Sequence, residues 1–204
     1  YWRKSKNMDI QFFKGLFKKY FDKYFESLEI MENKFKENSN VMEFESDGKI
    51  YYNKIELTKD KKIMIKNTSK TMLYNEFIIE NNVNLDFLIQ NTGELYIYNL
   101  YHIKSKSKLN IREKIYNAKK IVAISKIYIP EESKESEGYL YQILYDENSI
   151  SILLPIIDIR NNTSKGFHGS KKLKLSNEEI RYLKFFTLDE NRIKELLLKD
   201  FINI

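Results

Sequence analysis

The chain has 204 residues, of which 42% are hydrophobic, 31% charged and 14% aromatic, a composition typical of a folded domain with its own apolar core. It contains no cysteine, which excludes disulfides, thiolate zinc sites and cysteine nucleophiles. The formal net charge is +6, and part of it reflects a Lys-, Asn-, Ile- and Tyr-rich composition of the kind that an AT-rich coding sequence produces.

The N-terminal segment, residues 1–40, is expected to be helical. The chain begins at Tyr1 rather than Met, so we expect it to be processed or cut from a longer protein. Tyr1 and Trp2 precede three cations, an order typical of the cytoplasmic flank of a transmembrane helix. Apolar and aromatic residues at helical spacing from Asp9 to Glu37 predict an amphipathic helix. Its wide apolar stripe suits packing against another protein, a second subunit or lipid, or else complete burial in its own domain.

Residues 41–159 are expected to form a β-rich body of eight or nine strands. Asp47-Gly48 and Asn91-Thr92-Gly93 have turn residues that favour tight hairpins, so we predict mainly antiparallel sheets. On the strand from Glu94 to Ile103, the tyrosines are expected on the less buried face. The predicted strands cover Val41 to Ser46, Lys49 to Leu57, Lys61 to Lys66, Met72 to Glu80, Leu85 to Gln90, Glu94 to Ile103, Ile121 to Ile129, Tyr139 to Tyr145 and Ser149 to Ile159.

The last three strands are expected to form a meander after a short basic helix from Asn110 to Lys120. Pro155 has no amide donor, so its strand should lie at a sheet edge or carry a bulge. Residues 160–204 are predicted to form a basic loop followed by two helices, Asn177 to Phe186 and Leu188 to Phe201, each preceded by a capping box. The fold class is therefore α+β, and the chain is predicted to be a single domain.

Positive charge is concentrated in two segments. Residues 102–120 carry seven Lys or Arg and one Glu, and residues 160–174 carry five Lys or Arg and no acid, whereas residues 130–147 carry six carboxylates and one Lys. We expect the two basic segments to fold onto one anion-binding face. The candidate binding residues are Lys104, Lys106, Lys108, Lys119, Lys120, Arg160, Lys165, Lys171 and Lys172.

The stretch from Ser164 to Lys172 has the glycines and lysines of a phosphate-binding loop but not the Walker spacing, so a solvated connection is the preferred interpretation. His102 and His168 lie inside the two basic segments, and two histidines flanked by lysines can cleave a phosphodiester without metal. No cofactor or metal site is expected, since carboxylates such as Asp86, Glu94 and Asp158 lack the pattern of a metal-dependent nuclease.

These features predict a non-enzymatic interaction domain of a longer protein, on the cytoplasmic side and with membrane tethering left open. Its basic surface would bind an acidic partner or lipid headgroups, and its N-terminal helix would contact another protein or subunit. The alternative is a nucleic-acid-binding or phosphodiester-cleaving protein that uses His102 and His168.

Overall fold

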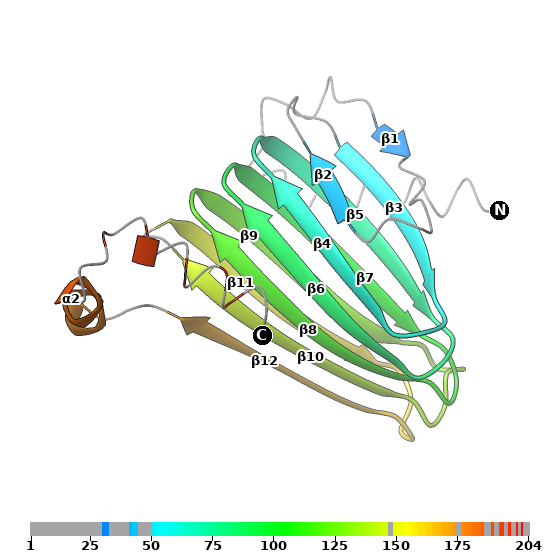
Figure 1. Cartoon of the computed structure of the whole chain (residues 1–204). Helices are drawn as coiled ribbons and strands as arrows, with labels where there is room; N and C mark the ends of the chain where they lie inside the picture. Colours follow the sequence, from blue (N-terminus) through cyan, green and yellow to red (C-terminus); the bar gives the residue numbers. More distant parts are fainter. Residues whose placement is uncertain are drawn as a thin grey trace.

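The computed structural model describes residues 30–32, 41–44, 50–146, 149–173 and 177–185, with single residues beyond, and forms a β-solenoid of about five turns (Figure 1). The strands alternate between two six-stranded sheets, and all neighbours are parallel. Sheet A has the order β1-β3-β5-β7-β9-β11, and sheet B has the order β12-β10-β8-β6-β4-β2. The strands are β1 (Ile30–Glu32), β2 (Val41–Phe44), β3 (Ile50–Leu57), β4 (Lys61–Asn67), β5 (Lys70–Ile79), β6 (Val83–Asn91), β7 (Glu94–Ile103), β8 (Lys108–Asn117), β9 (Lys120–Ile129), β10 (Glu137–Asp146), β11 (Ile150–Ile159) and β12 (Lys165–Leu173).

Each turn of the solenoid adds one strand to each sheet. The turns differ in length, since Ile50 pairs with Met72 but Lys120 pairs with Ile150, which is 22 residues in one case and 30 in the other. The extra residues lie in the corners, where the β9–β10 connection contains the acidic stretch of residues 130–136. The strands therefore stack in register although the repeat length varies.

The hydrophobic core lies between the two sheets because alternate side chains of the strands from β3 onward point inward. On β7 the inward positions include Leu95, Ile97 and Ile103, and on β8 they include Leu109 and Ile115, all fully buried. Burial of such a side chain contributes about 1.5–3 kcal/mol. Repetition over successive turns yields one continuous apolar column.

The outer face of sheet A is also buried at its centre. Tyr52, Tyr74 and Tyr98 lie on β3, β5 and β7, with neighbouring ring centroids 5.3 Å apart. Tyr96, predicted to lie on the less buried face, is 1% exposed. The prediction for Tyr96 and Tyr98 is therefore wrong, since both are buried in a second apolar cluster.

The prediction of an α+β fold with antiparallel sheets is wrong, because the described sheets are parallel. Most predicted strands are present with shifted ends, but β2 and β3 lie in different sheets, as do β6 and β7, so neither predicted hairpin exists. The predicted meander is likewise absent, since β10 lies in sheet B while β9 and β11 lie in sheet A. Pro155 lies on β11, the edge strand of sheet A, as expected.

Two predicted non-strand segments are strands. The expected basic helix from Asn110 to Lys120 is β8 and the start of β9, and the expected loop from Ser164 to Lys172 is β12. The predicted helix Asp9 to Glu37 lies outside the described residues except at Ile30–Glu32, which is β1.

The C-terminal segment contains the described helix α2, Asn177–Phe185, where a helix was expected. Beyond it, Phe201 is buried and its ring centroid lies 6.2 Å from that of Tyr145 on β10. Lys114 Nζ donates a hydrogen bond to the carbonyl oxygen of Phe201 at 3.3 Å. Phe201 therefore packs on the outer face of sheet B and not in the core between the sheets.

Candidate interaction surface

A ladder of polar side chains crosses the interior of sheet A. Asn53 Nδ2 donates to Asn75 Oδ1 at 2.7 Å, and Asn75 Nδ2 donates to Asn99 Oδ1 at 2.8 Å. Asn99 Nδ2 reaches Ser125 Oγ at 3.4 Å on the next strand. All four side chains are fully buried, so these bonds fix which residue stacks on which.

Glu113 on β8 joins this ladder to sheet B. It is fully buried, and its carboxylate accepts hydrogen bonds from Tyr101 Oη at 2.7 Å, Ser125 Oγ at 2.8 Å, Gln142 Nε2 at 2.7 Å and Asn99 Nδ2 at 3.2 Å. Burial, with the adjacent Glu113 charge, raises the pKa of Tyr101 well above its ordinary value. Glu113 and all four of its donors are fully buried, so we assign the cluster a structural role.

A second ladder occupies the corner between sheet B and the following strand of sheet A. Asn67 Nδ2 donates to Asn91 Oδ1 at 2.8 Å, and Asn91 Nδ2 donates to Asn117 Oδ1 at 2.7 Å. The next position of this ladder, on β10, is Asp146, which pairs in register with Asn117. A Cβ at Gly93 would lie 2.2 Å from the carbonyl oxygen of Ser69, so this corner requires glycine where successive turns stack.

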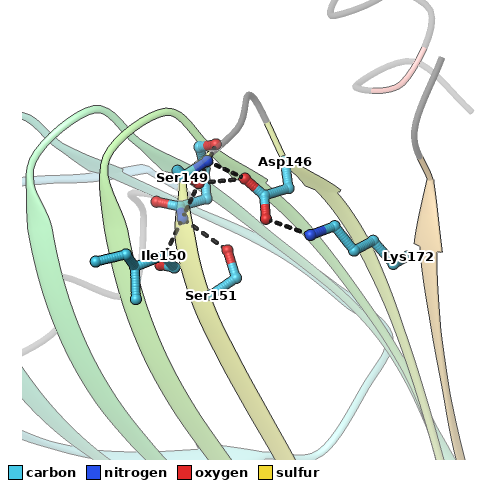
Figure 2. A network of polar contacts seen from close by, with 6 residues as sticks. Asp146, Ser149, Ile150, Ser151 and Lys172 are labelled. Carbon is cyan, nitrogen blue, oxygen red and sulfur yellow. Dashed lines mark hydrogen bonds and ion pairs between the residues drawn. The ribbon is translucent and has the colours of Figure 1, made fainter. Parts of the chain in front are cut away.

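Asp146 marks the change from the repeating interior to the end of the solenoid. Figure 2 shows its carboxylate between Ser149 and Lys172. The Ser149 backbone N–H donates to Oδ1 at 2.7 Å, and Lys172 Nζ lies 2.7 Å from Oδ2. Although burial raises it, the pKa of Asp146 is held below its ordinary value by the hydrogen bonds from Lys172 and Ser149. Lys172 thus ties β12 to the preceding turn.

The last strand of sheet B, β12, is exposed at seven of its nine residues and partly exposed at Gly169 and Leu173. None of its residues is buried, whereas alternate residues of β10 are. Its inward positions are His168, Ser170 and Lys172, which stack on Leu140, Gln142 and Leu144 of β10. Polar residues replace the apolar column at the point where the stack ends, as expected of a terminal repeat.

The hydrogen bonds at the ends of β11 show which of its backbone groups point to the open edge. The N–H groups of Ile150 and Arg160 donate to carbonyls of the β9 side at 3.0 and 2.9 Å. Since successive N–H groups of a strand point to opposite sides, the even-numbered residues face β9 and the odd-numbered ones face outward. Pro155 therefore lies where a donor would otherwise be presented on the open edge, and its ring obstructs strand addition there.

The same reasoning applied to β12 gives an open edge with its donors intact. The Lys165 N–H donates to the Ser136 carbonyl at 2.9 Å, so the odd-numbered residues face β10. The N–H groups of Gly166, His168, Ser170 and Lys172 point away from the sheet. No described strand pairs with this edge.

The outer face beside this edge is aromatic and basic. Phe167 is 60% exposed and Tyr141 on β10 is 41% exposed. Gly169 lies between them, and a Cβ added to it would lie 3.4 Å from the Tyr141 ring. Lys165 and Lys171 lie on the same face of β12, six residues apart. We call Lys165, Phe167, Gly169, Lys171 and Tyr141 the terminal-strand surface.

The predicted basic residues do not all gather on one face. β8 and β12 share sheet B, on either side of β10. Lys108 lies 3.1 Å from Glu137, and Lys119 lies 4.0 Å from Glu94 at the opposite corner. Lys120 lies over the Tyr96 ring at 5.2 Å, on the outer side of sheet A.

Carboxylates also separate the two basic corners. Lys104 and Lys106 lie in the β7–β8 corner, and the Lys106 N–H donates to the Lys134 carbonyl in the acidic corner at 2.9 Å. That acidic corner bonds on its other side to the β11–β12 corner, where Arg160 lies 2.5 Å from Asp158. Positive charge therefore extends along β12 rather than over the whole predicted face.

The two histidines are not brought together. His102 lies on the outer face of sheet A, with Nε2 3.8 Å from Glu76 Oε1 and its ring beside Tyr128. His168 lies on β12 in sheet B. The two backbones are separated by two strand spacings of about 4.8 Å along the stack and by one sheet spacing of about 10 Å at right angles to it, which places them roughly 14 Å apart. One phosphate cannot bridge the two imidazoles.

Sequence reasoning missed the two Asn ladders and the open edge of β12. The sequence does carry a signal for the ladders. The dipeptide Tyr-Asn recurs at residues 52–53, 74–75 and 98–99. An Asn also ends three successive strands, at Asn67, Asn91 and Asn117. These spacings of 22 to 26 residues are those between stacked residues of β3 and β5, β5 and β7, β4 and β6, and β6 and β8.

A search against models of protein families gave no match, and no curated protein matched the chain. Among the described residues, no three His, Asp or Glu side chains are placed to hold a metal ion. The described helical residues include no segment with the length and apolar character needed to span a membrane.

Proposed function

We propose that the chain is a non-catalytic interaction domain that binds an acidic protein segment through the terminal-strand surface. The observation that carries the proposal is that no residue of β12 is buried and that the strand contains three lysines, a histidine and no acid. Exposed aromatic side chains beside cations are typical of protein interaction sites, where the ring supplies contact area and the cations select the partner by charge.

The lysines of this surface differ from most other predicted cations in their surroundings. Lys108, Lys119 and Arg160 each have a carboxylate within 4.0 Å, whereas no ion pair involves Lys165 or Lys171 in the described part of the chain. Nearby Glu137 does interact electrostatically with Lys165. The attraction of a partner carboxylate should therefore be strongest near Lys171, toward the C-terminal end of β12.

The test is selection of ligands by the full chain from a displayed library of random peptides of about twelve residues, long enough to cover a strand of this length. We expect enrichment of peptides that combine acidic and apolar residues, with affinity that falls as salt increases. Vesicles of phosphatidylcholine with phosphatidylserine and single-stranded oligothymidylate are the competing probes. Binding to either probe with no enriched peptide would contradict the proposal.

Charge reversal locates the surface. The double variant Lys165→Glu and Lys171→Glu should raise the dissociation constant of a selected peptide by about tenfold or more, since two attractions become repulsions. The matched control is Lys104→Glu with Lys134→Glu, which changes the net charge equally at two exposed corner positions. Equal weakening by both pairs would show that the peptide does not bind at β12.

A further inference from the structure

We infer that the acidic segment binds as an additional β-strand along the open edge of β12, an inference that rests on the proposed function and specifies its geometry. The outward N–H groups of Gly166, His168, Ser170 and Lys172 follow from the hydrogen bond that Lys165 donates to Ser136. An extended peptide satisfies a row of such groups through its own backbone, which is the basis of recognition by strand addition.

The end of the solenoid offers two edges, and only one is suited to this mode. On β11, Pro155 lies at an outward-facing position, so a continuous ladder cannot form there. Described β12 has no proline, so each of its outward positions keeps its N–H. A partner strand is therefore directed to sheet B.

The side chains that flank the edge define the segment that would fit. Lys165 and Lys171 lie on one face at an interval of six residues, and Phe167 and Gly169 lie between them. Directly opposite neighbours in a β-sheet contact each other, so the segment should carry acidic residues six positions apart with apolar residues between them. The apolar residue opposite Gly169 would rest near the Tyr141 ring, which is 41% exposed.

A second copy of this chain is a poorer occupant. Antiparallel pairing of β12 with itself would place Lys165 of one copy near Lys171 of the other, and like charges directly opposite each other oppose pairing. Lysines on an edge strand have this effect generally. The same side chains attract an acidic segment, which is why the proposal commits to that partner.

The first test removes one edge donor. Proline at position 170 deletes an N–H that points outward. Position 155 of β11 also faces outward and already holds a proline, so this replacement suits an edge strand. We compare Ser170→Pro with Ser170→Ala, which loses the same side chain but keeps the N–H. For the peptide selected from the library, we expect the dissociation constant of the proline variant to exceed that of the alanine variant by about tenfold or more. Equal affinities would overturn strand addition.

The second test leaves the protein unchanged, so it does not depend on folding of the proline variant. Two versions of the selected peptide carry N-methyl groups on alternate residues, one on the odd and one on the even positions. Because only alternate N–H groups of an added strand face β12, one version should lose binding and the other should keep it. Equal effects of both versions would contradict the inference.

The outcomes separate the two proposals. If charge reversal weakens binding while the proline variant and both methylated peptides bind normally, the interaction surface stands and the strand geometry fails. If no acidic peptide is enriched, both fail. Amide hydrogen exchange gives a direct readout, since the N–H groups of Gly166, His168 and Ser170 should become protected in the complex.

Discussion

Replacement of Glu113 by Gln and by Leu should give very different losses of stability, although both remove the buried charge. The carboxylate accepts hydrogen bonds from Tyr101, Ser125, Gln142 and Asn99. In the described structure Gln142 Oε1 has no hydrogen-bond partner. A glutamine at position 113 could therefore keep one oxygen as an acceptor and donate its amide to Gln142 Oε1 after a flip of the Gln142 amide.

The expected magnitudes follow from counting the groups left without a partner. With Glu113→Gln, Tyr101, Ser125 and Asn99 keep an acceptor. The flip gives Gln142 Oε1 a donor and leaves Gln142 Nε2 without an acceptor in exchange, so the number of unpartnered groups is unchanged. Loss of the charge also reduces the cost of desolvation, so the free energy of unfolding should change by about 1 kcal/mol or less. With Glu113→Leu, up to four buried donors lose their acceptor, at about 1–3 kcal/mol each, so a loss of roughly 4 kcal/mol or more is expected. That is a large share of the stability of an ordinary domain, about 5–15 kcal/mol.

Urea unfolding followed by circular dichroism measures both values, provided that the m-value is unchanged. A loss for Glu113→Gln as large as that for Glu113→Leu would show that the charge, and not the number of acceptors, determines stability here. A tolerated Glu113→Leu would show that the donors find other partners inside the solenoid. Either result would refute the reasoning.

Three further predictions concern pH dependence and self-association. Hydrogen bonds from Arg160 and Lys126 lower the pKa of Asp158 to about 2, so its contribution is present above pH ~4 and is lost as the pH falls through 2. The difference in unfolding free energy between wild type and Asp158→Asn, at most about 2 kcal/mol at pH 7, should therefore shrink as the pH falls toward 2, and a constant difference would contradict this. Burial raises the pKa of Tyr101, so the contribution of its hydroxyl to stability is present below pH ~10 and is lost above it. The destabilisation by Tyr101→Phe, about 1 kcal/mol at pH 8, should therefore shrink in melting curves recorded above pH 10. A difference between the two proteins that stays constant with pH would contradict this. Pro155→Val introduces an edge donor on β11, so light scattering should show a larger oligomeric fraction at equal concentration. An unchanged fraction would show that the proline does not protect this edge.

The strands were predictable from the sequence because their apolar residues alternate, but the connections between them were not. Asn91-Thr92-Gly93 has the residues of a hairpin turn, yet Asn91 ends β6 and its side chain bonds to Asn117 one turn further along. Hairpins and solenoid corners use the same small and polar residues, so local turn chemistry does not distinguish reversal of the chain from a change of sheet. The Asn repeats distinguish them, but corners of unequal length obscure the period.

The strands β8 and β12 were missed because their inward positions are not all apolar. On β8 the inward column contains the charged Glu113 between Ile111 and Ile115, which breaks the alternation on which a strand prediction depends. On β12 the inward residues are polar because the stack ends there. The candidate surface was predictable only in part, since Lys165 and Lys171 follow from charge but the open edge follows from strand order.

The Asn ladders also bear on how the length of this domain can change. The amides in them bond within their own turn and to the adjacent turns, so an inserted copy of one turn would find the same partners that its neighbours already use. Such a duplication would lengthen the rod by about 4.8 Å for each turn gained. A gene that encodes this chain could thus vary the distance between its first strand and its terminal face in small, evenly spaced increments while the chemistry of both ends stayed the same.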